Sequence, residues 1–208
     1  MNNDIFNFVL YLAILLFSVS VHESAHGWMA EKFGDTTARF QGRITLNPVH
    51  HIDLVGSIIL PLILHFSGAP IFGWAKPVQV NPYNLRNRRK AWVYIAAAGP
   101  ASNLLIAIIS FIVFHIYKAA GYPGPRFIFT FLTSMVLLNV LLAVFNLMPI
   151  HPLDGSKILE GTLRGEALRN YEKLAPYGMI IFVVVIFSGV FNAIANPILH
   201  FVIGLLRG

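Results

Sequence analysis

The chain has 208 residues, of which 56% are hydrophobic and only 12% are charged, and its mean hydropathy is +0.68. This balance lies well outside that of a soluble globular domain and indicates an integral membrane protein. A net charge of +6 would also suit a nucleic-acid partner, but basic loops in a membrane protein follow from the positive-inside rule, so we expect no nucleic-acid binding. The absence of cysteine excludes disulfides and cysteine metal ligands.

The first apolar segment runs from Ile5 to Met29 and is long enough to cross a bilayer. No basic region precedes it, so we expect it to remain in the mature protein and not to be cleaved as a signal peptide. Near its end lies the HExxH sequence His22-Glu23-Ser24-Ala25-His26. Ionisable groups are costly in an apolar segment, and their presence there indicates a function.

The spacing of HExxH suits a metal site. On a helix, His22 and His26 lie one turn apart on the same face, so both imidazoles can bind one zinc ion. Zinc lowers the pKa of a bound water to about 7, and the adjacent Glu23 can take the proton as general base. The predicted chemistry is hydrolysis of a peptide bond. The alternative is a capped helix end with stray polar residues, which an amphipathic soluble helix would tolerate better than this segment does.

The region after this segment contains two stretches that favour β structure, residues 36–46 and 77–82. We predict small β-hairpin elements there, on the cytoplasmic side. Their exposed edge could hold an unwound substrate by strand addition, or the strands could only tie loops together; the sequence leaves both roles open. Between them, Leu54 to Phe66 is short and contains Pro61, so we expect a re-entrant segment or a short tilted span.

The rest of the chain is dominated by long apolar stretches. They are Ala91 to Tyr117, Phe127 to Met148, and Leu174 to Leu206, the last expected to hold two helices broken near Asn192. The predicted fold class is an all-α polytopic membrane protein with about five to six transmembrane helices and one re-entrant or short segment. We expect residues 1–208 to form a single domain, with a catalytic core at about 5–159 and C-terminal helices at about 174–206.

The basic residues predict the orientation. If Leu54 to Phe66 does not cross, all the Lys and Arg residues except Lys118 and Arg126 lie on one side of the membrane. The positive-inside rule makes that side cytoplasmic and the N-terminus external. The HExxH sequence and the residues that follow the Phe127 to Met148 span then lie at the same membrane level.

A catalytic zinc site needs a third protein ligand and an open position for water. Asp154 is the best candidate, because it follows the Phe127 to Met148 span, where prolines and Gly155 allow a sharp turn. The alternative is an ordinary Pro/Asp/Gly turn at a helix end. His151, three residues earlier, could be an accidental ligand, although a surface or gating role suits it better. Asn103, in an apolar span, either bonds helices together or binds substrate.

Taken in order, these motifs resemble those of the site-2 protease family of intramembrane zinc metalloproteases, peptidase family M50. The motifs are His22 to His26, Gly99-Pro100-x-x-Asn103, and Asn146-x-x-Pro149 leading to Leu153-Asp154-Gly155. The resemblance implies that His22, His26 and Asp154 bind zinc and that Glu23 is the general base. It also implies that Asn146 polarises the scissile carbonyl or stabilises the oxyanion. The likeness is to short prokaryotic members, so we expect no PDZ or CBS domain.

The function predicted from the motifs and the resemblance is that of a zinc-dependent intramembrane endopeptidase with one zinc ion per chain. It would cut membrane-spanning protein substrates near the cytoplasmic face, as a multi-pass protein of the cell membrane in contact with the lipid bilayer. One alternative is a metal-ion transporter, which would need polar positions along the whole bilayer depth. Another is a catalytically silent membrane scaffold, which we would expect to have lost Glu23 or a metal ligand.

Overall fold

The computed structural model of the chain describes residues 2–68, 73–122 and 124–208. Helices joined by turns and loops make up these residues, and none of them forms a β-strand. The predicted all-α class is therefore confirmed. The residues cluster into two compact units, Met1–Arg86 and Asn87–Gly208, and each unit is described by itself.

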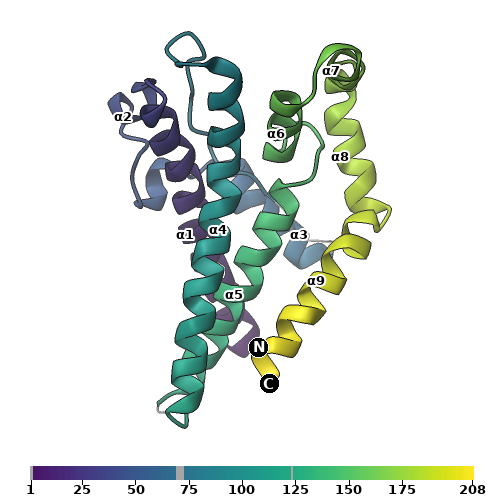
Figure 1. Ribbon diagram of the computed structural model, residues 1–208. Coiled ribbons are helices and arrows are strands. Elements are labelled where there is room, and N and C mark those ends of the chain that lie inside the picture. The colour runs from purple at the N-terminus through teal and green to yellow at the C-terminus, as the bar shows by residue number, and fades with distance from the viewer. Residues whose placement is uncertain (1, 69–72, 123) are drawn as a thin grey trace. The chain divides into compact units, whose positions relative to one another are not determined.

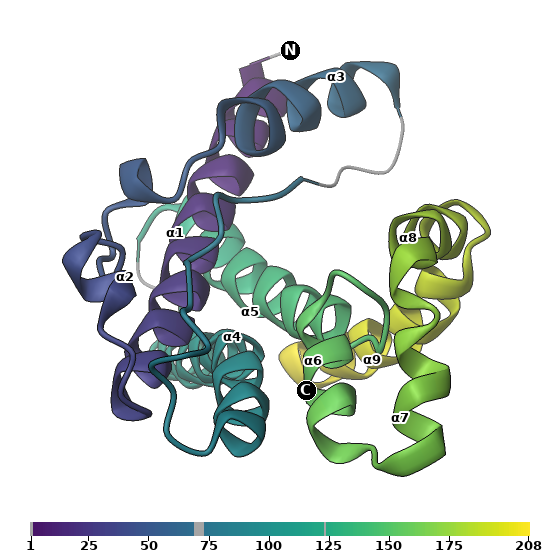
Figure 2. The same ribbon diagram turned by 90° about the horizontal axis from the view of Figure 1, so that it is seen from above.

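The first unit is organised around one long helix. This helix, α1, spans Asn2–Lys32, and its part from Ile5 to Lys32 is long and apolar enough to cross a membrane. The shorter elements that follow are α2 (Thr37–Phe40), the 3-10 helix η1 (Pro48–His50), the π-helix η2 (Leu54–Ile59) and α3 (Leu60–Ser67). Figure 2 shows α2 beside the C-terminal half of α1.

The predicted β-hairpin elements are not found among the described residues. Residues 37–40 are helical, because the Asp35 carboxylate accepts hydrogen bonds from the Thr37 backbone N–H at 3.1 Å and from its hydroxyl at 2.5 Å. These local bonds favour a turn over an extended strand. Residues 77–82 are not helical, but they pair with no described strand, because carboxylates accept two of their N–H groups.

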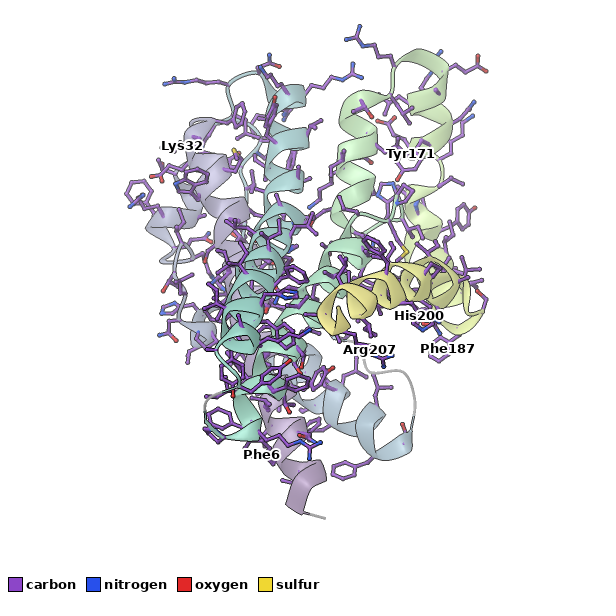
Figure 3. All side chains as sticks on the ribbon, turned by 60° about the horizontal axis from the view of Figure 1, so that its bottom comes forward. Phe6, Lys32, Tyr171, Phe187, His200 and Arg207 are labelled. Atoms are coloured by element: carbon purple, nitrogen blue, oxygen red, sulfur yellow. The ribbon has the colours of Figure 1, made fainter. Side chains whose placement is uncertain are left out.

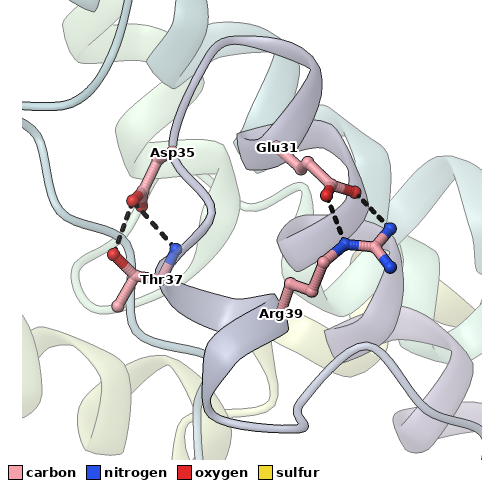
Figure 4. Close-up of polar contacts among 4 residues, drawn as sticks. All are labelled: Glu31, Asp35, Thr37 and Arg39. Carbon is pink, nitrogen blue, oxygen red and sulfur yellow. Dashed lines mark hydrogen bonds and ion pairs between the residues drawn. The ribbon is translucent and has the colours of Figure 1, made fainter.

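Four donors converge on the buried side chain of Asp35. Besides both groups of Thr37, the carboxylate accepts the Asn81 backbone N–H at 2.7 Å and the Asn84 side-chain amide at 2.9 Å. We call Asp35, Thr37, Asn81 and Asn84 the Asp35 clamp. Figure 4 shows its local half beside an ion pair between Glu31 and Arg39. The clamp ties the loop that ends the first unit to the turn that follows α1.

Acid should loosen the Asp35 clamp. Burial by itself would raise the pKa of the Asp35 carboxyl, but hydrogen bonds from Thr37, Asn84 and Asn81 together outweigh burial and hold the pKa below its ordinary 3.8. A lowered pKa stabilises the folded state above pH 3.8, and this contribution is lost as the pH falls through the folded value. The melting temperature should therefore fall more between about pH 5 and about pH 3 in the parent than in Asp35→Asn. Equal pH dependence in thermal unfolding of the two proteins would contradict the assignment.

The predicted re-entrant or short span is helical. It consists of η2 and α3, and the Asp53 carboxylate caps its start by accepting the Gly56 N–H at 2.8 Å. The apolar helical part, Leu54–Leu64, is shorter than the helices that qualify as spans. Its length fits the predicted re-entrant or tilted segment, and its course in the membrane remains a prediction.

The second unit contains the other long helices. They are α4 (Arg88–Ala119), α5 (Arg126–Asn146), α6 (Asp154–Thr162), α7 (Gly165–Glu172), the 3-10 helix η3 (Ala175–Tyr177), α8 (Gly178–Phe187) and α9 (Val190–Arg207). Helices α4 and α5 lie side by side (Figure 1). Phe114, Leu132, Val136 and Leu206 form a buried apolar cluster that joins α4, α5 and α9.

The C-terminal apolar stretch forms two helices as predicted, but they separate earlier than expected. Figure 3 labels Phe187 at the end of α8 and His200 and Arg207 on α9. The break lies at Gly189, whose φ of 81° is one that glycine adopts without strain, and Asn192 lies inside α9. In the described residues, five helical stretches are long and apolar enough to cross a membrane. The chain is therefore a multi-pass membrane protein.

Candidate metal centre

The two histidines of HExxH meet on α1. Their Nε2 atoms are 3.0 Å apart, their ring centroids are 4.6 Å apart, and both side chains are buried, with exposed fractions of 6% for His22 and 9% for His26. Two nitrogens bound at ~2.0–2.1 Å by one tetrahedral zinc ion would be about 3.3 Å apart. The observed pair is close to that geometry, so both imidazoles fit as ligands of one ion.

The carboxylate of Glu23 is held by a backbone group that sequence reasoning missed. Its Oε2 accepts the N–H of Val78 at 2.8 Å, from a non-helical segment of the same unit. Because a general base needs only one oxygen for the proton, this bond orients the carboxylate and leaves Oε1 for the reaction. A backbone donor has no signature in the sequence, so no residue pattern could have identified Val78.

Gly27 lets this segment approach α1. A Cβ at Gly27 would lie 3.0 Å from the Ala38 Cβ, 3.2 Å from the Ile44 Cγ1 and 3.3 Å from the Val78 Cγ1. These separations are tighter than ordinary carbon contacts, so a side chain there would push the neighbours away. Gly27 follows His26 directly, and a glycine inside an apolar helix was the available sequence signal for such a close approach.

Ser24, one of the unspecified positions of HExxH, fixes a second loop. Its Oγ donates to the Thr45 carbonyl at 2.6 Å and accepts the Thr45 N–H at 3.2 Å. The buried His51 ring lies 3.0 Å from the same carbonyl through Nε2, and the His51 carbonyl accepts the Lys76 N–H at 2.8 Å. The loops of the first unit are thus bonded to the helix that carries the two histidines.

In the second unit, Asp154 is the first residue of α6 and is buried, with an exposed fraction of 8%. The predicted sharp turn is present: Gly155 lies so close to the carbonyls of Leu147 and Met148 that a Cβ would collide with both. Ser156 steadies the turn by donating its hydroxyl to the Leu153 carbonyl at 2.7 Å. Carboxylate oxygens are among the groups that bind zinc in proteins. The chemistry of Asp154 therefore suits a metal ligand.

Asn103 bridges two helices. Its side-chain amide donates to the Asn139 Oδ1 at 2.9 Å, and Asn139 in turn donates to the Met135 carbonyl at 2.9 Å. Both asparagines are fully buried, and the bond joins α4 to α5. The helix-bonding role, one of the two predicted for Asn103, is therefore present. A role in substrate binding remains a prediction.

Asn146 ends α5, and its side-chain amide donates to the Leu142 carbonyl at 2.9 Å. The amide nitrogen carries two hydrogens, so one remains for another acceptor. His151 contacts two other side chains. Its ring centroid lies 5.2 Å from that of Tyr171, and its Nε2 is 3.5 Å from the Glu160 Oε1. At that distance the imidazole and the carboxylate attract each other when the ring is protonated, but they do not form a hydrogen bond. These contacts favour the predicted non-ligand role.

Comparison with known proteins places the chain in a family. The sequence profile described as peptidase family M50 matches residues 10–126 and 125–187. YwhC of Bacillus subtilis (strain 168), assigned as a zinc metalloprotease, is 36% identical over 91% of this chain and 86% of its own. Rip2 of Mycolicibacterium smegmatis, assigned likewise, is 30% identical over 89% and 69% of the two chains.

A more distant relative is also named as a zinc metalloprotease. Zinc metalloprotease MJ0392 of Methanocaldococcus jannaschii is 28% identical over 78% of this chain and 37% of its own. No solved structure matches the chain. The family profile covers most of the sequence, and its members' names agree with the HExxH pair on α1. The chain belongs to peptidase family M50, the site-2 protease family, and is a membrane-embedded, zinc-dependent metalloendopeptidase.

Proposed function

We propose that the protein cleaves peptide bonds inside membrane-spanning segments of other proteins, near the cytoplasmic face. The observation that carries the proposal is the position of the histidine pair. His22 and His26 are buried, with Nε2 atoms 3.0 Å apart, on a helix that is itself long and apolar enough to cross a membrane. Ionisable groups on such a helix are costly and are retained for function. A metal site at this position can act on chains that enter the bilayer.

The two units form one catalytic domain in this proposal, and Asp154 completes the ligand set with His22 and His26 around a single zinc ion. Two imidazoles and one carboxylate would supply three ligands, and a catalytic zinc site needs three protein ligands and one position for water. The burial of Asp154 behind a glycine-dependent turn supports this role. The His151 ring instead contacts Tyr171 and Glu160.

Each polar residue of the centre then has a distinct task. A zinc ion held there would act as a Lewis acid, lowering the pKa of water and polarising a carbonyl. Glu23 takes the proton of the attacking water on Oε1 while Oε2 stays on the Val78 N–H, and it later delivers that proton to the leaving amine. Asn146 donates its second amide hydrogen to the carbonyl oxygen as negative charge develops there.

A membrane-spanning substrate must unwind locally before it can be cut, because its carbonyls are held in helical hydrogen bonds. In the first unit, residues 74–78 donate alternate N–H groups to other parts of the unit. Trp74 donates to the Gly56 carbonyl, Lys76 to the His51 carbonyl and Val78 to Glu23. This two-residue period is that of a strand. The bonds tie loops together, and we propose that the opposite edge receives the unwound substrate by strand addition.

The proposal is tested with purified protein in detergent and peptides that contain one membrane-spanning segment. We expect cleavage that a chelator abolishes and added zinc restores, because the chemistry depends on the metal. A matched soluble peptide of the same length, lacking the apolar segment, should be cut poorly. Cleavage that survives full removal of zinc, or a preference for the soluble peptide, would contradict the proposed function.

The orientation can be tested directly because the chain has no cysteine. Single cysteines at the exposed positions Gln41, Tyr83 and Thr162 should react with an impermeant thiol reagent only after the cytoplasmic side is opened. A cysteine at Ala120, also exposed, should react from outside. If the cysteine at Tyr83 reacts from outside instead, the segment from Leu54 to Phe66 crosses the membrane and the proposed topology is wrong.

A further inference from the structure

We infer that Asp35 is a positioning residue for Glu23: the Asp35 clamp fixes the segment from Val78 to Asn81, and the Val78 N–H in turn orients the Glu23 carboxylate. The inference rests on the proposed role of Glu23 as general base. All of the residues concerned belong to the first unit.

The anchor at Asp35 is built for holding backbone. The side chain has an exposed fraction of 0%, Oδ1 accepts from Thr37 and from the Asn84 amide at 2.9 Å, and Oδ2 accepts the Asn81 N–H at 2.7 Å. Each bond has a charged acceptor, which makes it stronger than a neutral one. Because the carboxylate accepts from Asn81 and Asn84 at once, it fixes the position of both residues.

The anchored residue, Asn81, lies close along the chain to Val78, whose N–H orients Glu23. Asn81 is three residues after Val78, and no helix or turn lies between them. At the far side of the clamp, the Arg86 N–H donates to the Phe33 carbonyl at 2.8 Å, which holds the same loop from its other end. The segment is therefore held at Asn81 and Arg86 by groups that directly follow α1, and at Val78 by Glu23 itself.

Gly27 shows how closely the segment is fitted to the helix. The Val78 Cγ1 would lie only 3.3 Å from a Cβ at Gly27, one turn beyond Glu23 on α1. Two further hydrogen bonds hold this segment, one from the exposed Gln41 side-chain amide to the Gln79 side chain at 2.9 Å and one from the Lys76 N–H to the His51 carbonyl. Neither involves a charged group, so loss of the charged anchor at Asn81 should still let Val78 move outward. The Glu23 carboxylate would then lose its orienting donor while zinc binding by His22 and His26 would remain.

The expected effect lies in the chemical step. A displacement of about 1 Å in a reacting group can cost about 100-fold in rate. We expect Asp35→Asn to lower kcat about 10- to 100-fold, with KM within about threefold of the parent and zinc content unchanged. The matched control is Glu31→Gln, which makes the same chemical change near the same end of α1 and removes the ion pair with Arg39. It should keep kcat within about twofold of the parent, because exposed ion pairs contribute little.

Amide exchange reads the same contact without turnover. In Asp35→Asn the amides of Val78 and Asn81 should exchange faster than in the parent, whereas in Glu31→Gln they should not. Asn84→Ala removes one donor and leaves the carboxylate, so it should give a smaller change in the same direction. If Asp35→Asn fails to fold, Asn84→Ala provides the same test of the clamp. Unchanged exchange at Val78 in Asn84→Ala and in Asp35→Asn, or loss of zinc together with kcat in both, would overturn the inference.

Substitution at the donor itself tests the relay. Val78→Pro removes the N–H, whereas Val78→Ala keeps it and shortens the side chain that lies near Gly27, so the proline variant should lose far more kcat. If Asp35 acts through Val78, the double variant Asp35→Asn with Val78→Pro should be no slower than the slower single variant. A double variant in which the kcat losses of the two single variants multiply would overturn the inference that Asp35 acts through Val78. A parent that cuts no peptide would refute the proposed function, and the exchange data would still decide whether Asp35 holds Val78.

Discussion

Glu23→Gln is expected to abolish peptide cleavage while the protein keeps its zinc. The substitution removes the proton acceptor but leaves His22, His26 and Asp154, and general-base catalysis contributes about 10²–10⁴-fold to the rate. The glutamine carbonyl can still accept the Val78 N–H, so the surrounding structure should be preserved. Metal analysis beside the cleavage rate measures both quantities in one preparation.

The control for this variant is Glu31→Gln on the same helix, two turns further along. It should retain both zinc and activity, because its carboxylate forms an ion pair with the exposed Arg39, with Oε2 accepting from Nη2 at 2.7 Å. A Glu23→Gln protein that cuts within about tenfold of the parent rate would remove Glu23 from the role of base.

Asp154→Ala is expected to lose zinc, whereas His151→Ala should retain it. Removing a residue that merely supports a ligand costs about 10–100-fold in metal affinity, and removing a ligand should cost at least about 100-fold. His151 contacts Tyr171 and Glu160, so its loss should affect local packing more than the metal. Zinc affinity is measured by competition with a chromophoric chelator.

The comparison of these two variants also tests the ligand set. Asp154→Asn is a useful third variant, because it keeps the shape of the buried side chain and removes its charge. It should bind zinc more weakly than the parent and more tightly than Asp154→Ala. The reverse pattern, with His151 essential and Asp154 dispensable, would replace the His/His/Asp set by one of three histidines.

The local part of the centre was predictable from the sequence because helix periodicity determines it. The spacing of His22 and His26 placed both rings on one face, and the structure brings their Nε2 atoms to 3.0 Å. The turn before Asp154 followed from prolines and from Gly155, which cannot carry a side chain there. In each case the controlling interaction lies within a few residues of the motif.

Other predictions depended on competition that the sequence pattern does not resolve. Residues 36–46 are rich in β-formers, yet the Asp35 carboxylate starts a helical turn at Thr37. The break in the C-terminal stretch was expected near Asn192, but the conformational freedom of Gly189 decides it. In uniformly apolar helices there is little periodicity to locate an end.

The contact between Val78 and Glu23 could not be predicted at all. It joins residues 55 positions apart and uses a backbone donor, so no side chain at position 78 marks it. Asp35 gave a weak signal, since Asp two residues before Thr is typical of a turn that the aspartate caps. Its bonds to Asn81 and Asn84 depend on the tertiary fold.

The central claim is that water directed by this centre cuts a membrane-spanning segment near its cytoplasmic end. The direct measurement uses protein reconstituted in vesicles with a single-span substrate in ¹⁸O-water, followed by mass spectrometry of the fragments. The account predicts one zinc-dependent cut within the cytoplasmic part of the span, with the heavy oxygen on the new carboxyl terminus and no product from Glu23→Gln. Cuts confined to the aqueous flanks of the substrate, or the same product from Glu23→Gln, would contradict it.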